Sequence, residues 1–346
     1  MRKYYYTNLK GRNRMQNSTK KAIIASGAAL GAVVSAAAIS HITTKYLVSV
    51  ALDRKPPKST PSSRQKLTGI TDSSVFEIRE AINAKRLEEK CTTVEIESFD
   101  GEKLVGHWYE GNNPKRVIIA MHGWRSSWTS DFGVISDFWH DNDCSVLYAE
   151  QRGQNNSGGG YMSFGLIERY DCYEWIKWVC EKTGETMPIY LGGVSMGAAT
   201  VLMTAGFDLP ECVYGIVADC GYTAPSEIWK HVMENNLKIN YNMRKNTINK
   251  MCLKRLNCGA EDYSALEAMR VCNVPVLFIH VTDDHFVPIG MTYENYKACT
   301  APKRLFVVPG AEHGMSYYVD KMGYEVAVKN FWKDCERKML NKCKNN

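Results

Sequence analysis

The sequence predicts an α/β fold built on a mostly parallel, eight-stranded sheet flanked by helices, with a helical cap insertion. From residue 91 onward, short β-rich runs alternate with helix-length segments, which is typical of a doubly wound sheet. The later runs are continuously apolar, as expected for parallel strands that are buried on both faces. About fifty residues, 222–273, separate the sixth and seventh runs. This stretch is too long for a simple crossover and is predicted to form the cap.

Each element of this fold has its own signal in the sequence. The predicted strands are 92–97, 103–109, 117–121, 145–148, 188–194, 213–218, 274–281 and 304–308. The first two alternate between apolar and polar residues, which predicts an antiparallel hairpin at the sheet edge. The predicted helices are 128–141, 166–181, 196–206, 226–236, 291–299 and 317–338. Because ligands bind at the carboxyl ends of parallel strands, we expect the site residues in the loops that follow the strands.

Charge and cysteine usage exclude several classes of protein. The net charge is +6, but seven of the 43 basic residues lie in the first 21 residues, which leaves 36 against 37 acidic residues. The rest of the chain is therefore nearly neutral, and nucleic acid is not predicted as a partner. The twelve cysteines include no C-x-x-C pair, so neither a zinc site nor a small disulfide framework is expected. Most are predicted to be small buried hydrophobes, and free thiols favour a reducing environment.

The N-terminal part divides into a basic segment (1–21), a membrane anchor or signal segment (22–48), and a linker with a lead-in helix (49–90). Residues 22–40 contain no charged side chain and are just long enough to cross a bilayer as a helix. A single retained transmembrane helix is the favoured interpretation. A secretory signal cleaved near Ala36-Ala37-Ala38 and a soluble or surface-lying helix remain alternatives. The basic cluster favours an extracytoplasmic body, whereas the free cysteines argue for the other side.

Two segments connect this region to the body, which spans 91–346. Residues 52–70 are rich in proline, serine, threonine and lysine, a composition typical of linkers. Residues 73–90 carry apolar side chains at helical spacing and are predicted to form a helix.

Residues 193–197, Gly-Val-Ser-Met-Gly, fit the G-x-S-x-G nucleophile elbow, in which a serine lies in a sharp turn between a strand and a helix. A predicted strand precedes the motif, and a predicted helix that begins with small residues follows it. Small neighbours are needed because the helix packs close to the strand at this strained turn. The motif predicts Ser195 as the nucleophile of an α/β-hydrolase fold, although the motif taken alone also fits an ordinary glycine-rich turn.

A base and an acid follow the nucleophile in the chain order of that fold. His313 follows the eighth predicted strand and Asp284 the seventh, so both lie in strand-end loops, where catalytic groups usually occur. A neutral histidine can accept the serine proton, and a carboxylate behind it fixes the tautomer and stabilises the imidazolium. Asp284 is the predicted acid, with Asp283 beside it and Asp219 at the end of the sixth strand as alternatives.

Two backbone N–H groups are predicted to bind the oxyanion of the tetrahedral intermediate. Met196 directly follows the nucleophile, and Trp124 lies in the His-Gly-Trp run after the third strand. His122 and His280 are predicted to be buried hydrogen-bonding residues, because His313 already provides the base. No metal or organic cofactor is expected.

From about residue 91 to the C-terminus, the chain resembles bacterial α/β-hydrolases of the serine-aminopeptidase-like group, which are related to prolyl oligopeptidase and often carry an N-terminal hydrophobic segment. The matching runs are MHGW (121–124), QRGQNNSGG (151–159), GVSMGAAT (193–200), ADCGYT (218–223), DDHFVP (283–288) and GAEHGMSYY (310–318). Residues 150–157 read EQRGQNNS where the group often has D-x-R-G-x-G-x-S, and Val281 replaces a frequent glycine after His280. Neither departure removes a catalytic group, but both can change the shape of loops near the site.

The resemblance implies a serine hydrolase that works through an acyl-enzyme intermediate. Relatives of prolyl oligopeptidase carry a β-propeller in front of this domain, and the roughly ninety residues before Thr92 cannot build one. Small carboxylic esters are therefore favoured as substrates. A peptidase or amidase acting on short peptides, an acyltransferase and a non-catalytic binding protein remain alternatives. The oligomeric state is not predicted.

The cap carries a set of large apolar residues that suits an acyl pocket but also suits simple packing of the cap onto the body. These residues are Trp229, Met233, Leu237, Tyr241, Met243, Met251 and Leu253.

Overall fold

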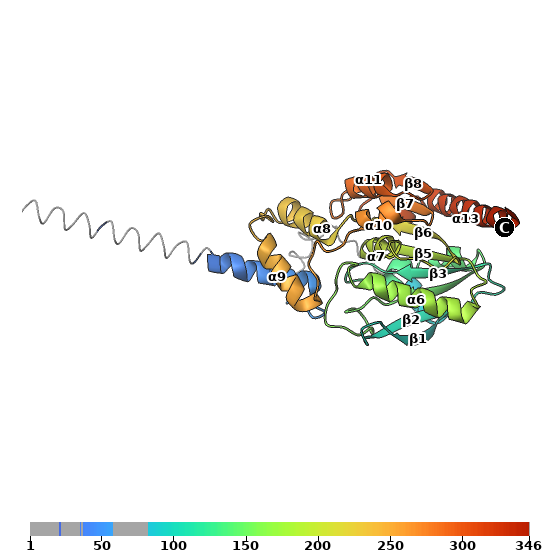
Figure 1. The fold of residues 1–346 in the computed structure, drawn as a ribbon, viewed down its shortest axis with the longest axis horizontal. Helices are drawn as coiled ribbons and strands as arrows, with labels where there is room; N and C mark the ends of the chain where they lie inside the picture. The colour runs from blue at the N-terminus through green and yellow to red at the C-terminus, as the bar shows by residue number, and fades with distance from the viewer. Residues whose placement is uncertain (1–20, 22–34, 36, 58–81, 346) are drawn as a thin grey trace, which may run out of the picture.

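An eight-stranded sheet in the order β1-β2-β4-β3-β5-β6-β7-β8 forms the centre of the computed structural model, which describes residues 21, 35, 37–57 and 82–345 (Figure 1). The strands are β1 (Thr92–Glu97), β2 (Lys103–Tyr109), β3 (Arg116–Met121), β4 (Cys144–Ala149), β5 (Ile189–Val194), β6 (Val213–Asp219), β7 (Val276–Val281) and β8 (Lys303–Val308). Strand β2 pairs antiparallel with both β1 and β4, and β3 to β8 are mutually parallel. All eight predicted strands are confirmed, each end within two residues of its expected position.

Helices cover both faces of the sheet, because the parallel strands bury apolar side chains on both sides. The helices are α4 (Trp128–Phe132), α5 (Ser136–His140), α6 (Glu168–Thr183), α7 (Met196–Thr204), α8 (Pro225–His231), the π-helical η1 (Val232–Asn236), α9 (Lys245–Leu256), α10 (Ala265–Val271), α11 (Ile289–Ala298), α12 (Ser316–Val319) and α13 (Lys321–Asn345). Helices α6, α7, α10 and α11 share one apolar core with the sheet, while α4, α5 and α13 share the other. The α/β-hydrolase fold class is confirmed.

Several helices differ in extent from the prediction. The predicted helix 128–141 is two short helices, interrupted around Gly133, a residue with low helix propensity. The predicted helix 317–338 is divided at Asp320, whose carboxylate accepts a hydrogen bond from the Gly323 N–H, 2.8 Å away, and so caps the start of α13. Helices α9 and α10 were not predicted individually within the cap.

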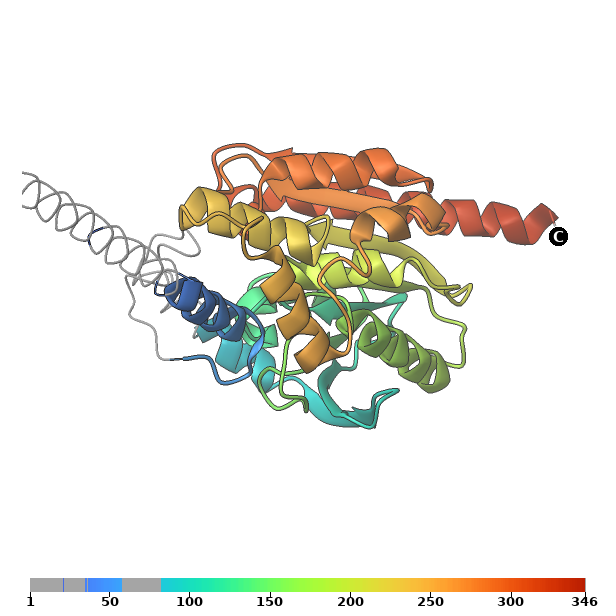
Figure 2. The ribbon, with the colours of Figure 1, turned by 60° about the vertical axis from the view of Figure 1, so that its left-hand side comes forward.

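Residues 222–273 contain α8, η1, α9 and α10. Helix α10 packs on α7 of the body, whereas α8, η1 and α9 lie beyond one end of the sheet. Helix α9 lies beside an N-terminal helix that spans 37–52 (Figure 2). A salt bridge of 2.8 Å between Arg255 in α9 and Asp53 joins the two. The insertion and the N-terminal helix therefore form one layer over this end of the sheet.

The N-terminal helix differs from the sequence-based expectation at its C-terminal end. The sequence assigns residues from 49 onward to a linker, whereas Leu52 is fully buried in the main apolar core. Most of the predicted membrane segment, 22–34 and 36, lies outside the described residues. Within the described ranges, no helix is long and apolar enough to cross a membrane. Of the predicted lead-in helix 73–90, residues 82–88 are described and helical.

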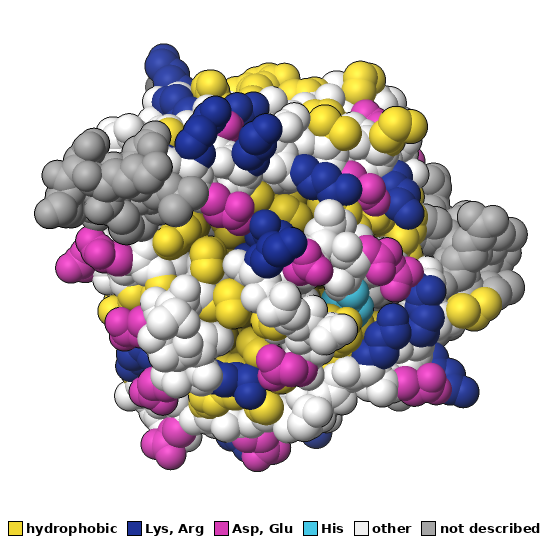
Figure 3. Space-filling model, turned by 90° about the vertical axis from the view of Figure 1, so that its right-hand side faces the viewer, with side chains coloured by type: hydrophobic (Ala, Val, Ile, Leu, Met, Phe, Trp, Pro, Cys, Tyr) yellow, Lys and Arg dark blue, Asp and Glu magenta, His cyan; other side chains and the backbone are white. Residues whose placement is uncertain are grey.

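The face of the molecule in Figure 3 carries basic and acidic side chains interspersed with one another and with apolar patches. The described cysteines are free, and all except Cys91 and Cys258 are buried. They therefore pack as small apolar side chains in the part of the chain that the structure describes.

Candidate active site

Ser195 lies at the sharp turn between β5 and α7, with φ of 56° and ψ of −115°. A positive φ is unusual for a residue with a side chain and marks a locally strained turn. The Ser195 N–H donates to the Asp219 carbonyl oxygen at the end of neighbouring strand β6, 2.8 Å away, which holds the turn against the sheet. The side chain is thereby presented at the carboxyl end of the sheet, at the start of α7.

Close backbone packing around the turn explains the two glycines of the motif. A Cβ atom on Gly197 would lie 1.8 Å from the Met121 carbonyl oxygen, and one on Gly193 would lie 2.3 Å from the Gly197 carbonyl oxygen. Both distances are far below van der Waals contact, so α7 can approach β3 and β5 only where side chains are absent.

We expect Gly197→Ala to lower the free energy of unfolding by about 3 kcal/mol or more, because the added methyl group forces β3 and α7 apart. The measurement is denaturant unfolding followed by circular dichroism. Gly160→Ala is the matched control, since a Cβ at Gly160 meets no atom within 4 Å. Equal stability of the two variants would contradict the packing argument.

Ser195, His313 and Asp284 come together in one hydrogen-bonded line. His313 Nε2 lies 2.8 Å from Ser195 Oγ, and His313 Nδ1 lies 2.6 Å from Asp284 Oδ2. The other carboxylate oxygen, Asp284 Oδ1, accepts hydrogen bonds from the backbone N–H groups of Phe286 and Val287. Asp284 is thus fixed on both of its oxygens. This is the geometry needed for a serine nucleophile, a histidine base and an orienting carboxylate.

Electrostatics within this line favour a histidine that readily accepts a proton. Burial lowers the pKa of His313, but the charge and hydrogen bond of Asp284 outweigh it and raise the pKa above its ordinary value. Burial also disfavours the Asp284 carboxylate, yet its interactions with His313 and His280 hold the pKa of Asp284 well below its usual range. Asp284 therefore stays ionised beside a histidine whose protonated form it stabilises.

The carboxylates of the two alternative acids have other hydrogen-bond partners. Asp283 is exposed, and its carboxylate accepts from the Thr282 hydroxyl. Asp219 is buried, but Oδ1 accepts from the hydroxyl of Ser316 at 2.7 Å and from the thiol of Cys220 at 3.1 Å. Neither carboxylate is recorded in a hydrogen bond with His313, so the structure pairs the histidine with Asp284.

His280 lies next to Asp284, and both of its ring nitrogens have hydrogen-bond partners. Its Nε2 lies 2.9 Å from the Val287 carbonyl oxygen and 3.2 Å from Asp284 Oδ2, and its Nδ1 lies 2.7 Å from the Thr292 hydroxyl. Cys220, His280 and Asp284 are the one described group whose ligand-type atoms lie close enough together, within 4.8 Å, to suggest a metal. Because both His280 nitrogens and both Asp284 oxygens already have protein partners, this group fits a hydrogen-bonded support for the acid.

The predicted oxyanion donors flank the nucleophile. Met196 is the first residue of α7, so its N–H has no partner within the helix and lies at the positive end of the helix dipole. Trp124 follows Gly123, where a Cβ would lie 3.5 Å from Ser195 Cβ. The two backbone segments therefore border the serine, and their role as oxyanion donors stays a prediction.

Several side chains that the sequence analysis did not assign hold the loop that contains Trp124. Asp131 Oδ2 accepts from the Gly123 N–H at 2.6 Å, and Gln154 Oε1 accepts from the Arg125 N–H at 2.6 Å. His122 accepts on Nε2 from the Gln151 N–H, and its Nδ1 lies 2.8 Å from the Gly123 carbonyl oxygen. The two glutamines belong to the run at 150–157 that departs from the family pattern. Both glutamines occupy variable positions of that pattern, so the sequence carries no signal for this arrangement.

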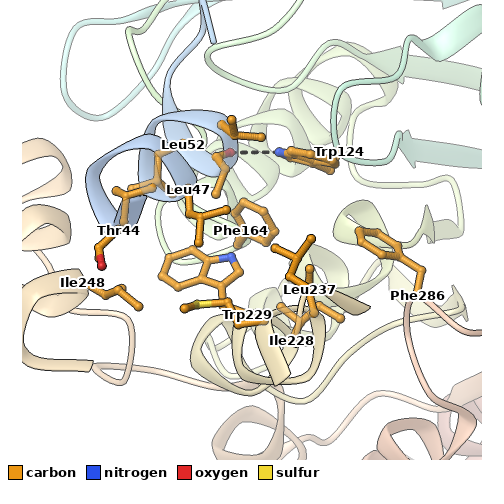
Figure 4. Close-up of a pocket in the computed structure, with 15 residues that line it drawn as sticks. Thr44, Leu47, Leu52, Trp124, Phe164, Ile228, Trp229, Leu237, Ile248 and Phe286 are labelled. Carbon is orange, nitrogen blue, oxygen red and sulfur yellow. Dashed lines mark hydrogen bonds between the residues drawn. The ribbon is translucent and has the colours of Figure 1, made fainter. Parts of the chain in front are cut away.

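An apolar pocket lies between the cap and the N-terminal helix, and Trp124 and Phe286, from the loops that follow β3 and β7, form one end of it (Figure 4). It measures about 640 Å³, including the part open to solvent. Of the seven large apolar cap residues singled out in the sequence, Trp229, Met233 and Leu237 line this pocket. Met243 and Leu253 are instead 82% and 46% exposed. They do not line the pocket because they lie on the outer side of the cap.

Comparisons with known proteins agree with the fold. No family model matches the chain. The uncharacterized protein YqkD of Bacillus subtilis is 27% identical over 244 residues, covering 69% of this chain and 78% of that protein. The Pyrococcus furiosus esterase Pf2001 superposes with a TM-score of 0.58 at 24% identity, over 72% of this chain and 94% of that one. The acylaminoacyl peptidase of Pyrococcus horikoshii gives a TM-score of 0.53 at 14% identity, over 72% of this chain and 41% of that one. These likenesses show the α/β-hydrolase fold.

Proposed function

We propose that the protein is a serine hydrolase that cleaves carboxylic esters through an acyl-enzyme intermediate. The observation that carries this proposal is the line from Ser195 Oγ through His313 to Asp284, with distances of 2.8 Å and 2.6 Å. A carboxylate, a histidine and a serine in this geometry, bordered by two backbone amides, suit nucleophilic attack on a carbonyl carbon.

The reaction follows from the positions of the atoms. Ser195 Oγ attacks the ester carbonyl carbon while His313 Nε2 takes the hydroxyl proton, and Asp284 stabilises the imidazolium. The carbonyl oxygen becomes an oxyanion, which the N–H groups of Met196 and Trp124 stabilise. The imidazolium then gives its proton to the leaving alkoxide, and the acyl-enzyme remains. Water repeats the sequence, which releases the acid and restores the serine.

The apolar pocket supports ester substrates over peptides. Its walls offer almost no polar group to recognise a peptide backbone, and a buried peptide group without partners would lose its hydrogen bonds to water. The similarity to an esterase, Pf2001, agrees with this choice. The acylaminoacyl peptidase is the counterexample, and this chain spans only 41% of that protein.

We expect kcat/KM for an alkyl ester to exceed that for the matched alkyl amide, with the same acyl group, by at least about 10³-fold. The measurement is product release from both substrates by the purified full chain. Amide cleavage within about tenfold of ester cleavage would overturn the ester proposal in favour of a peptidase or amidase. Adding an alcohol to the ester reaction tests acyl transfer, because alcohol and water compete for the same acyl-enzyme.

A further inference from the structure

The last turn of the N-terminal helix is fastened to the loop that carries the predicted oxyanion donor. The Trp124 indole Nε1–H donates to the Ala51 carbonyl oxygen at 2.9 Å. The Arg125 guanidinium donates to the carbonyl oxygens of Val50, at 2.6 Å, and Asp53, at 2.7 Å. Carbonyl groups at a helix C-terminus lack partners within the helix and favour a cation, so these contacts satisfy the end of the helix. The helix is thus bonded directly to the active-site loop.

The same helix forms one wall of the apolar pocket. Thr44, Leu47 and Val48 line it from the helix, opposite Trp229 and Ile248 of the cap. Thr44 carries the one hydroxyl among the described lining residues, and this hydroxyl donates to the Ser40 carbonyl oxygen of its own helix at 2.7 Å. With that hydroxyl occupied, the wall presents apolar groups to the pocket. A ligand there is held by burial of apolar surface.

One end of the pocket is formed by Trp124 and Phe286, from the loops that follow β3 and β7. Trp124 is the residue whose backbone N–H is a predicted oxyanion donor, and the Phe286 ring packs edge-on against the His313 ring, with centroids 5.1 Å apart. Figure 4 shows Trp124 and Phe286 at one end, with Thr44 and Ile248 at the other. Phe286 therefore belongs both to the pocket wall and to the contact with His313, which places this end of the pocket next to the triad.

We propose that the N-terminal helix is a specificity-determining part of the site, and that it forms, together with the cap, a pocket for an unbranched apolar acyl chain whose far end is set by Thr44 and Ile248. This proposal rests on the proposed ester hydrolysis and names its substrate class. The chain lies against residues 44–48 of the helix. The helix therefore selects acyl length while it also holds the oxyanion loop.

The test is kcat/KM of the full chain on p-nitrophenyl acetate, butyrate, octanoate and laurate. In the wild type, kcat/KM rises by up to about fourfold for each methylene until the pocket is full. Thr44→Phe shortens the pocket, so kcat/KM for octanoate falls at least about tenfold while that for acetate stays within about twofold. Ile248→Phe shortens the pocket from the cap side and is expected to give the same loss on octanoate without loss on acetate. The second variant keeps the test valid if the first does not fold.

Ile42→Phe is the matched control, because Ile42 lies on the same helix but is 66% exposed. It leaves the chain-length profile unchanged. Unaltered octanoate activity in both pocket variants, or an equal loss on acetate and octanoate, would overturn the proposal. In either result, acetate hydrolysis by the wild type still supports the ester hydrolase. A wild type that hydrolyses none of the four esters refutes the proposed function itself, and the acyl pocket with it.

Discussion

Ser195→Ala is expected to reduce kcat for ester hydrolysis by about 10⁶-fold, close to the loss seen when a serine triad is removed altogether. The reason is that the variant lacks the hydroxyl that lies 2.8 Å from His313 Nε2. Substrate binding and stability change little, since the substitution removes one oxygen atom and leaves the turn intact. Steady-state kinetics on a short-chain ester, together with thermal unfolding, measure both quantities.

The matched control for this variant is Ser136→Ala. Ser136 is also a buried serine, but it lies in α5, where its hydroxyl donates to the Gly133 carbonyl oxygen. We expect full activity and a loss of about 1 kcal/mol of stability. A Ser195→Ala protein that retains a tenth of the wild-type kcat would mean that hydrolysis does not proceed through this serine.

Asp284→Asn is expected to lower kcat by about 10⁴-fold with little change in the fold. An asparagine can still accept from the Phe286 and Val287 N–H groups through its oxygen. Its amide then faces His313 Nδ1, which lies 2.6 Å from the native Oδ2. The histidine must accept that hydrogen bond, so its proton moves to Nε2 and it can no longer take one from Ser195.

The pH dependence of the same variant gives an independent readout. Asp284 raises the pKa of His313, so in the wild type kcat/KM falls as the pH drops through a value above the ordinary histidine pKa. Removing the carboxylate charge disfavours the imidazolium. In Asp284→Asn, the fall of kcat/KM at low pH therefore moves to a lower pH. Asp283→Asn is the control, and we expect it to keep the wild-type kcat and the wild-type pH at which kcat/KM falls. A larger loss in Asp283→Asn than in Asp284→Asn would reverse the assignment of the acid.

The sequence is most informative where a local pattern corresponds to one local structure. Strands β4 and β7 are buried along their whole length, and the turn at Ser195 requires the two glycines whose Cβ atoms would strike the backbone. His313 and Asp284 follow from chain order once the turn is recognised. These features depend on neighbouring residues and on strand order, both of which can be read along the chain.

The packing of the N-terminal helix could not be predicted from the sequence. An apolar helical segment has the same composition whether it packs against lipid or against a cap, so the sequence gives no sign that Leu47 and Leu52 belong to the body. Helix α9 carries a sparse signal, with Ile248, Cys252 and Leu256 spaced four residues apart as the buried positions of a largely polar helix. The hydrogen bond from the Gly123 N–H to Asp131 joins the loop after β3 to helix α4, and this partner cannot be predicted from sequence spacing.

The most direct test of the central claim, that Ser195 is an activated nucleophile, is labelling of the intact protein with a fluorophosphonate probe. Such probes react with a serine hydroxyl that a neighbouring histidine activates. We predict one covalent adduct per chain, mapped by mass spectrometry to the peptide that contains Ser195, and no adduct in folded Ser195→Ala. A folded wild type that remains unlabelled, or an adduct that persists in Ser195→Ala, would contradict the assignment of Ser195 as the nucleophile.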